Sequence, residues 1–247
     1  MMAHATKVRV DQLLVERGLA DSREKARALI IAGDVLIDGQ KSDKPGRSVA
    51  SDSQVTVAAR LPYVSRGGVK LAGALDHFGI DASGYVCLDV GSSTGGFTDC
   101  LLQRGAARVW SVDVGHGQLD WKLRNDPRVV VREGVNARYL SPDEIPEQFD
   151  LAVCDASFIS ATLLIPEFVP LLKKDGQMIV LVEPQFELGK GQVGKGGIVR
   201  DPALNRAACD RVQACVEAHG FRAAIVESPI QGAEGNREFL LYGQPRH

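Results

Sequence analysis

The sequence predicts an α/β protein in which a doubly wound parallel sheet, with helices on both faces, follows a small α+β module. Three observations support this fold class. Strand-like and helix-like segments alternate from residue 86 onwards. The apolar segment 86–91 runs directly into a glycine-rich turn and a helix, as ligand-binding strands of such sheets do. The first 60 residues differ in charge, carrying a net +2 against −4 for the remainder.

Two short helices open the chain. The segment 11–17 has apolar residues at its centre and stops at Gly18. The segment beginning Asp21-Ser22-Arg23-Glu24 has a capping-box arrangement and ends at Gly33. Residues 35–40 then predict a strand that enters a tight turn at Asp38-Gly39.

Basic side chains on this front module suggest contact with RNA. Arg23 and Arg27 are four positions apart and share one helix face. These two arginines would contact a phosphate backbone without reading bases, together with Lys25, Lys41, Lys44 and Arg47. The alternative is a charged surface that is merely solvated, since it would have the same composition. The segments 10–14, 22–30 and 32–35 resemble the S4 RNA-binding domain. The residues we expect to contact RNA are Arg9, Arg23, Lys25, Arg27 and Lys41, joined further along the chain by Arg66 and Lys190.

The larger part of the chain has the pattern of strands separated by helices. Strands are predicted near 86–91, 108–114, 129–133, 149–155, 177–183, 222–228 and 237–243, and the principal helices at 97–104, 160–173 and 202–219. Acidic residues close several of these strands, namely Asp89, Asp113, Asp155 and Glu183. Because ligands bind beyond the carboxyl ends of the strands in such sheets, these residues are candidates for a site.

The turn after the first of these strands predicts the cofactor. It has the form Gly91-x-x-x-Gly95-Gly96 and lacks the G-x-G-x-x-G spacing of dinucleotide-binding proteins. Asp113 ends the next strand, where a carboxylate can hold the ribose hydroxyls of an adenosine. S-adenosylmethionine fits these features better than NAD does, and a purely structural turn is the alternative. The expected cofactor contacts are Asp89, Gly91, Ser93, Thr94, Gly95, Gly96, Phe97, Asp113, Asn136 and Ala137.

Composition excludes several other classes of protein. The five cysteines include no C-x-x-C pair, which is typical of reduced thiols in the cytoplasm. No apolar run reaches the roughly 18 residues of a membrane span, and no leader pattern is present. The histidines and cysteines lack ligand spacing, so no metal site is expected.

Motifs distributed over nearly the whole chain resemble those of the TlyA family. They are Ser65-Arg66-Gly67-Gly68, Asp89-Val90-Gly91-Ser92-Ser93-Thr94-Gly95-Gly96, Asp155-Ala156-Ser157-Phe158, Pro184-Gln185-Phe186-Glu187 and Asn236-Arg237-Glu238. Members of this family are described as haemolysins or as ribosomal RNA methyltransferases with a Rossmann-like, FtsJ-like catalytic domain. The resemblance implies an S4-like domain at 1–59, a linker at 60–63 and a methyltransferase domain at 64–247.

The resemblance also implies a reaction, transfer of a methyl group from S-adenosylmethionine to a ribose 2′-hydroxyl of ribosomal RNA within ribosomal subunits. FtsJ-like enzymes use a Lys-Asp-Lys-Glu tetrad, and Lys70, Asp155 and Glu238 match its first, second and fourth members. The third position is Glu183, where the family pattern has lysine. Without the resemblance, Lys70 would be a surface lysine, Asp155 a helix cap and Glu238 an edge-strand ion-pair partner.

Glu183 reverses a charge at the position credited with activating the hydroxyl, and three consequences are open. In the first, the Glu183 carboxyl group is protonated. In the second, it acts as a general base, and in the third, it disables the reaction. Lys190 or Lys195, in a glycine-rich loop, would be a substitute cation. The sequence therefore favours an RNA 2′-O-methyltransferase over a catalytically impaired RNA-binding or ribosome-assembly protein. A membrane-lytic protein is less favoured, because no amphipathic basic helix stands out.

Overall fold

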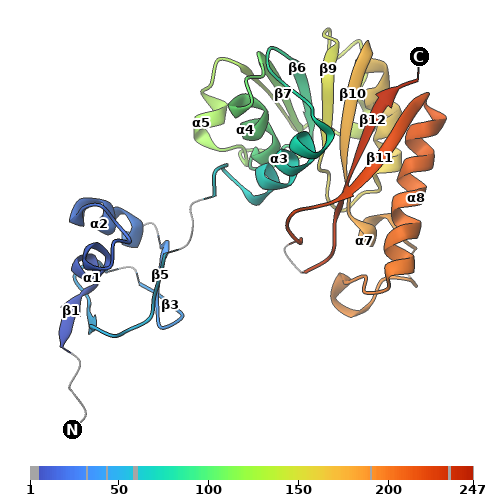
Figure 1. The fold of residues 1–247 in the computed structure, drawn as a ribbon. Helices are drawn as coiled ribbons and strands as arrows, with labels where there is room; N and C mark the ends of the chain where they lie inside the picture. Colours follow the sequence, from blue (N-terminus) through green and yellow to red (C-terminus); the bar gives the residue numbers. More distant parts are fainter. Residues whose placement is uncertain are drawn as a thin grey trace. The chain divides into compact units, whose positions relative to one another are not determined.

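The computed structural model describes residues 6–31, 33–42, 44–57, 61–189, 191–232 and 235–246. The chain divides into two compact units, Met1–Arg60 and Leu61–His247 (Figure 1). The larger unit has an α/β architecture, a sheet with helices packed on it, and the smaller unit consists of short helices and strands. This arrangement confirms the predicted fold class.

In its described residues, the N-terminal unit contains two helices and five short strands. Its elements are β1 (Lys7–Arg9), α1 (Val10–Glu16), α2 (Arg23–Ile31), β2 (Val35–Ile37), β3 (Gln40–Lys41), β4 (Ser48–Ala50) and β5 (Val55–Val57). Strand β1 pairs with β4, and β2 lies between β3 and β5. Leu14, Ile30 and Val35 are buried where the two helices pack on the strands.

The predicted turn and helix start of this unit can be traced to single residues. Asp38 and Gly39 have φ of 50° and 79°, which join β2 to β3 in the left-handed conformation of a two-residue hairpin turn. At the start of α2, Ser22 Oγ accepts a hydrogen bond from the Lys25 amide at 3.2 Å. Asp21 instead forms an ion pair with Lys25 at 2.6 Å, so the cap is Ser22.

The C-terminal unit is built on a seven-stranded sheet (Figure 1). Its strands are β6 (Val86–Val90), β7 (Arg108–Asp113), β8 (Val129–Glu133), β9 (Phe149–Cys154), β10 (Leu172–Val182), β11 (Phe221–Glu227) and β12 (Phe239–Pro245). Their order is β11-β12-β10-β9-β6-β7-β8. All seven lie where the sequence predicts strands, although β10 begins earlier than expected.

One strand departs from the predicted parallel sheet. Strand β12 pairs antiparallel with both β10 and β11. A parallel crossover needs a dozen or more residues, usually with a helix, and only the short segment between Glu227 and Phe239 joins β11 to β12. The chain therefore turns back, which brings the start of β12 to the carboxyl ends of its neighbours.

Helices cover both faces of this sheet. They are α3 (Arg66–Phe78), α4 (Gly96–Gln103), α5 (Trp121–Arg124), α6 (Ile165–Phe168), α7 (Pro184–Glu187) and α8 (Pro202–Ala218), with single 3₁₀ turns η1 (Ala137–Tyr139), η2 (Ala161–Leu163), η3 (Val169–Leu171) and η4 (Lys195–Gly197). One core joins the sheet to α3 and α4, and another joins it to α6 and α8. Alternate residues of β6 serve the two cores, with Cys87 in the first and Leu88 in the second.

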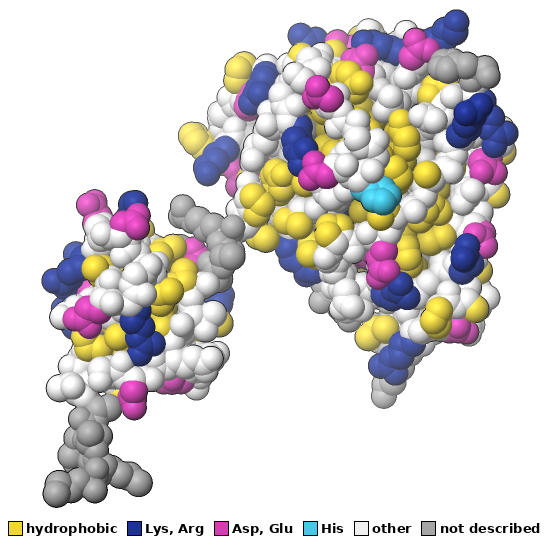
Figure 2. Space-filling view, in the orientation of Figure 1, with side chains coloured by type: hydrophobic (Ala, Val, Ile, Leu, Met, Phe, Trp, Pro, Cys, Tyr) yellow, Lys and Arg dark blue, Asp and Glu magenta, His cyan; other side chains and the backbone are white. Residues whose placement is uncertain are grey.

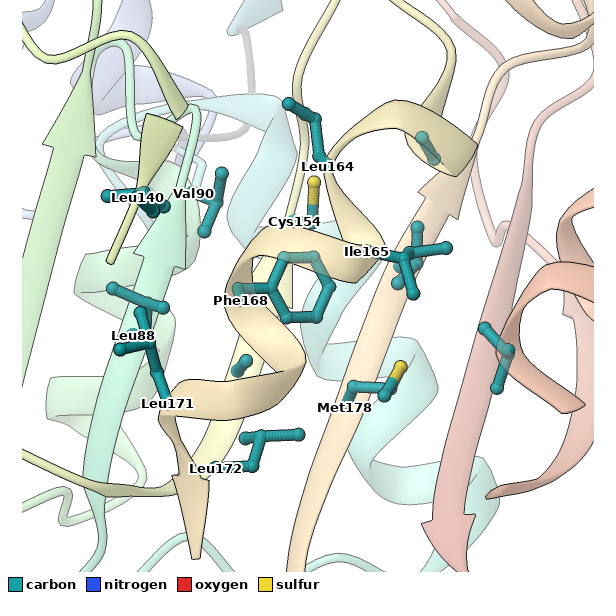
Figure 3. Packing of buried hydrophobic residues seen from close by; sticks show 14 of the residues in the cluster. Leu88, Val90, Leu140, Cys154, Leu164, Ile165, Phe168, Leu171, Leu172 and Met178 are labelled. Atoms are coloured by element: carbon teal, nitrogen blue, oxygen red, sulfur yellow. The ribbon is translucent and has the colours of Figure 1, made fainter. Parts of the chain in front are cut away.

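The predicted continuous helix at 160–173 is wrong. The segment consists of η2, α6 and η3 in succession, and β10 already begins at Leu172. Pro166 and Pro170 each lack the amide hydrogen that a continuing helix needs, which explains the interruption. The segment still packs as its apolar pattern requires, with Phe168 placed over the sheet among Leu88, Cys154 and Met178 (Figure 3).

Candidate active site

A cavity of about 580 Å³ lies at the carboxyl ends of β6, β7, β8 and β9. Its walls are formed by residues that end or follow these strands, including Asp113, Asn136 and Asp155. A smaller cavity of about 140 Å³ shares Gly91, Ser93, Asp155 and Ser157 with it. The two cavities are therefore parts of one site at the edge of the sheet where the sequence predicts ligand binding.

The glycine-rich turn closes tightly around this site. Gly91 has a φ of 82°. A Cβ there would lie 2.6 Å from the carbonyl oxygen of Asp155, so no larger residue fits. Ser93, with a φ of 47°, shares the left-handed conformation. Thr94, Gly96 and Phe97 line the smaller cavity.

Gly95 has a different role from its neighbours, since it is not among the residues that line either cavity. Its φ of 93° places it as the N-terminal cap residue of α4. Gly95 directs the chain into α4 and so helps to hold the glycine-rich turn without lining a cavity.

Asp113 is held rigidly at the end of β7. Its Oδ2 accepts a hydrogen bond from the Ser93 amide at 2.8 Å, and its Oδ1 accepts one from the Gly115 amide at 2.7 Å. Asn136 Oδ1 accepts from the Arg138 amide at 3.1 Å. Asp113, Asn136 and Ala137 all line the larger cavity, as expected for residues that contact an adenosine.

Asp89 lies elsewhere. It is fully buried beneath the turn and lines neither cavity. Its Oδ2 accepts a hydrogen bond from Thr98 Oγ1 at 2.6 Å, which ties β6 to α4. Burial raises the pKa of the Asp89 carboxyl to about 7. The structure therefore gives Asp89 a supporting position in place of the predicted cofactor contact.

Four ionisable side chains converge beside the cavities. Lys70 of α3 and Glu238, just before β12, form an ion pair with 2.6 Å between Nζ and Oε2. Asp155 follows β9 and Glu183 follows β10. Because β9, β10 and β12 are neighbours in the sheet, residues distant in sequence meet here.

This cluster has unusual protonation chemistry. Burial raises the pKa of Asp155 to about 6, while the charge of Lys70 acts in the opposite direction. Burial, and then the carboxylates of Asp155 and Glu238, raise the pKa of Glu183 to about 7. Ser157 Oγ donates to Glu183 Oε2 at 3.2 Å, and Gln185 Nε2 donates to Oε1 at 3.1 Å.

Asn236 and Arg66 hold loops beside Glu238 in place, a structural role that the sequence did not predict for them. Asn236 donates to the carbonyl of Gly197 and accepts from the Val199 amide, both at 2.9 Å. Arg66, predicted to contact RNA, donates to the carbonyl oxygen of Gln231. Its guanidinium thus helps to hold the loop that precedes Glu238.

Phe158 is the clearest residue that the sequence interpretation missed. It lines the larger cavity, is 89% exposed and has a φ of 69°. Glu187 holds the following residues, since it accepts from Ser160 Oγ at 2.5 Å and from the Ala161 amide at 2.7 Å. The signal available in the sequence was a large aromatic residue within a polar segment directly after Asp155.

The predicted RNA-contacting side chains of the N-terminal unit differ in their surroundings. Arg9 and Arg23 both contact the buried carboxylate of Asp11, at 2.9 and 3.1 Å, and the Arg9 hydrogen bond is the main reason why the pKa of Asp11 falls to about 2. Arg27 and Lys41 are exposed. Basic and acidic side chains are interspersed on the face of this unit in Figure 2. Lys190 lies outside the described residues.

Comparison with known families gives two matches. The FtsJ-like methyltransferase model matches residues 63–244, and the S4 domain model matches residues 8–55. These matches confirm the predicted combination of domains.

Comparison with individual proteins agrees with the family matches. A Mycobacterium tuberculosis protein named 16S/23S rRNA (cytidine-2′-O)-methyltransferase TlyA is 48% identical over 96% of this chain and 90% of its own length. A Campylobacter jejuni protein named 23S rRNA (cytidine-2′-O)-methyltransferase TlyA is 34% identical over 92% and 96%, respectively. A solved structure from Streptococcus thermophilus, described as a hemolysin, is 41% identical with a TM-score of 0.75 and covers 98% of this chain and 89% of its own. The predicted resemblance to TlyA is confirmed.

Proposed function

The chain belongs to the FtsJ-like methyltransferase family, and we propose that it transfers a methyl group from S-adenosylmethionine to a ribose 2′-hydroxyl of ribosomal RNA. The observation that carries this proposal is the position of Asp155, which lines both cavities and belongs to the cluster of ionisable side chains. Asp155 thus belongs both to the proposed cofactor site and to the cluster that would take up the proton.

The residues around the larger cavity fit S-adenosylmethionine. A volume of about 580 Å³ is within the range of small-molecule sites. Asp113, oriented by two backbone amides, would accept hydrogen bonds from the ribose hydroxyls, and Asn136 and Ala137 would lie beside the adenine. Gly91 and Ser93 would leave room for the part of the molecule that carries the methyl group. When bound, the cofactor supplies an electrophilic methyl group on a positively charged sulfur.

The protein's own part in the reaction is to position a poor nucleophile and remove its proton. A ribose hydroxyl does not ionise readily near neutral pH, so it needs a base or a cation beside it. Lys70, Asp155, Glu183 and Glu238 would form this environment. The Lys70–Glu238 ion pair fixes one side of it, with side chains only 12% and 3% exposed.

RNA recognition would use both units. The S4 domain offers exposed basic residues, Arg27 and Lys41 among them, for phosphate contacts. Phe158 offers an exposed ring at the mouth of the cavity, where a base displaced from its stack would find an aromatic surface. The names of the relatives support ribosomal RNA as the substrate, and from such a substrate we infer a cytoplasmic location.

Two of the relatives are named as rRNA methyltransferases, which favours catalysis over RNA binding alone. In the part of the chain that the structure describes, no helix is long and apolar enough to cross a membrane. The hemolysin name of the Streptococcus relative is therefore not matched by a spanning helix in the described residues.

The direct test is transfer of radiolabelled methyl groups to purified small and large ribosomal subunits. We expect label in ribosomal RNA from at least one subunit. An absence of label in both subunits and in protein-free ribosomal RNA, with protein that binds the cofactor, would overturn the proposal.

A further inference from the structure

We infer that Glu183 is the general base that takes the proton from the attacking ribose hydroxyl, in place of the lysine that the family pattern has at this position. The inference rests on the proposed methyl transfer and concerns how this particular chain performs it. It assigns one of the three open roles of Glu183.

The sheet places Glu183 at the centre of the ionisable cluster. Strand β10 lies between β9 and β12. Val180 is paired with Cys154, the residue before Asp155, and Val182 is paired with Phe239, the residue after Glu238. In this register position 183 follows directly on the pair that adjoins Glu238 on one side, and it lies two residues beyond the level of Asp155 on the other.

Among the four described side chains of the cluster, the one cation is already paired. Of the four side chains, only Lys70 is positive, and its ammonium group is paired with Glu238 at 2.6 Å. A cation-assisted mechanism needs a positive charge that stabilises the forming alkoxide. Within this cluster the paired lysine is already neutralised, which favours proton removal by a carboxylate; the side chains of Lys190 and Lys195, named above as substitute cations, lie outside what the structure describes.

Glu183 is suited to accept this proton. Burial and two neighbouring carboxylates raise its pKa to about 7, whereas that of Asp155 rises to about 6. A base whose pKa is close to the working pH combines availability with proton affinity. Ser157, which lines both cavities, donates to Glu183 Oε2 at 3.2 Å and so links the carboxylate to the cavity.

The step balances without another reagent. The ribose O–H bond breaks and its proton passes to the Glu183 carboxylate. The oxygen forms the new bond to the methyl carbon as the methyl–sulfur bond breaks with its electron pair on sulfur, which removes the positive charge. The proton then leaves Glu183 for water, and the carboxylate is restored.

The test is the pH dependence of single-turnover methyl transfer to ribosomal subunits, for wild type, Glu183→Gln and Glu183→Lys, with cofactor affinity measured by calorimetry on the same proteins. For wild type we expect the rate to rise with pH to a plateau, with a midpoint near 7. Glu183→Gln should lose this rise and about 10²–10⁴-fold in plateau rate. Its cofactor affinity should stay within about threefold of wild type, since Glu183 is not among the residues lining the cofactor cavities.

Two outcomes would overturn the inference while leaving the proposed function intact. One is a Glu183→Gln variant with the wild-type rate and pH profile, and the other is a Glu183→Lys variant faster than wild type, which would make the carboxylate an impediment. A wild type without transfer at any pH, in spite of cofactor binding, would instead refute the methyl transfer itself.

A second variant tests the same role without removing the base. Gln185 donates to Glu183 Oε1 at 3.1 Å, and this hydrogen bond favours the charged carboxylate. Gln185→Met should therefore move the midpoint of the rate profile to higher pH, by about one unit, with the plateau retained. An unchanged midpoint would contradict the assignment of the profile to Glu183.

Thermal unfolding gives a readout that does not depend on activity. The pKa of Glu183 is raised in the folded protein, so its contribution to stability is present at low pH and is lost as the pH rises from about 4.5 through about 7. The melting temperature of Glu183→Gln relative to wild type should thus increase between pH 5 and pH 8. A constant difference over this interval would show that Glu183 does not titrate there.

Discussion

Lys70 Nζ lies 2.6 Å from Glu238 Oε2, and the two side chains are 12% and 3% exposed. The ion pair joins α3 to the start of β12 across the face of the sheet. The carboxylate is further confined by Gly232, where a Cβ would clash with Glu238 Oε1. This contact serves both stability and the electrostatics of the cluster.

Removal of Lys70 should therefore destabilise the protein as well as inactivate it. Lys70→Met leaves a buried carboxylate without its cation, and we expect a loss of about 3 kcal/mol in the free energy of unfolding. The double variant Lys70→Met with Glu238→Met should recover most of this stability but no activity, because the buried charge is gone. Urea denaturation provides the measurement. A double variant as unstable as the single one would argue against an uncompensated charge as the cause.

Asp113 should determine cofactor affinity. Asp113→Asn keeps acceptor capacity for one backbone amide but loses the charge, and we expect about 10–100-fold weaker binding of S-adenosylmethionine by calorimetry. Asp120→Asn is the matched control, since Asp120 also accepts a backbone hydrogen bond, from Lys122 at 2.8 Å, but does not line the cavity. Equal effects of the two substitutions would remove Asp113 from the cofactor site.

Phe158 should act on RNA and not on the fold. The residue is 89% exposed, so Phe158→Ala should leave the melting temperature unchanged. Loss of one stacking contact is expected to lower kcat/KM about 10–100-fold with cofactor affinity unaltered. Leu163→Ala, at an apolar residue that is 46% exposed and outside the cavity walls, serves as control. A full-rate Phe158→Ala enzyme would exclude the stacking role.

The S4 domain should contribute salt-dependent affinity. The double variant Arg27→Ala with Lys41→Ala removes two exposed cations and should reduce the slope of log affinity against log salt by about 1–2. Arg222 is an exposed arginine of β11, and Arg222→Ala is the control for the loss of one positive charge elsewhere on the surface. Binding to ribosomal subunits measured at several salt concentrations gives the slopes. If the double variant and wild type had identical slopes, Arg27 and Lys41 would have no phosphate contacts.

Much of the fold could be predicted because local pattern and tertiary structure agree. Strands β6, β7, β9 and β11 are apolar segments bounded by turns, and their positions match the expectation. The predicted helix at 160–173 is wrong because Pro166 and Pro170 divide the segment into short turns. The direction of β12 follows from the short segment between Glu227 and Phe239, which the pattern within the strand itself does not reveal.

The sequence could predict where the candidate residues lie when their position follows directly from the end of a strand. Asp113, Asp155 and Glu183 end or follow parallel strands, and all three lie at the predicted edge of the sheet. Asp89 is one residue short of its strand end, so the alternation of the strand directs it into the protein towards Thr98. The ion pairing of Arg9 and Arg23 with Asp11, and the exposure of Phe158, depend on tertiary contacts that no local pattern encodes.

The central claim, methyl transfer to a ribose hydroxyl by the cluster that contains Asp155, is tested most directly by digesting ribosomal RNA to nucleosides after reaction and identifying the methylated product by mass spectrometry. Wild type should yield a 2′-O-methyl nucleoside, and Asp155→Asn, with cofactor still bound, should yield at least about 100-fold less in the same time. Methyl groups on a base, or an Asp155→Asn enzyme as productive as wild type, would contradict the account.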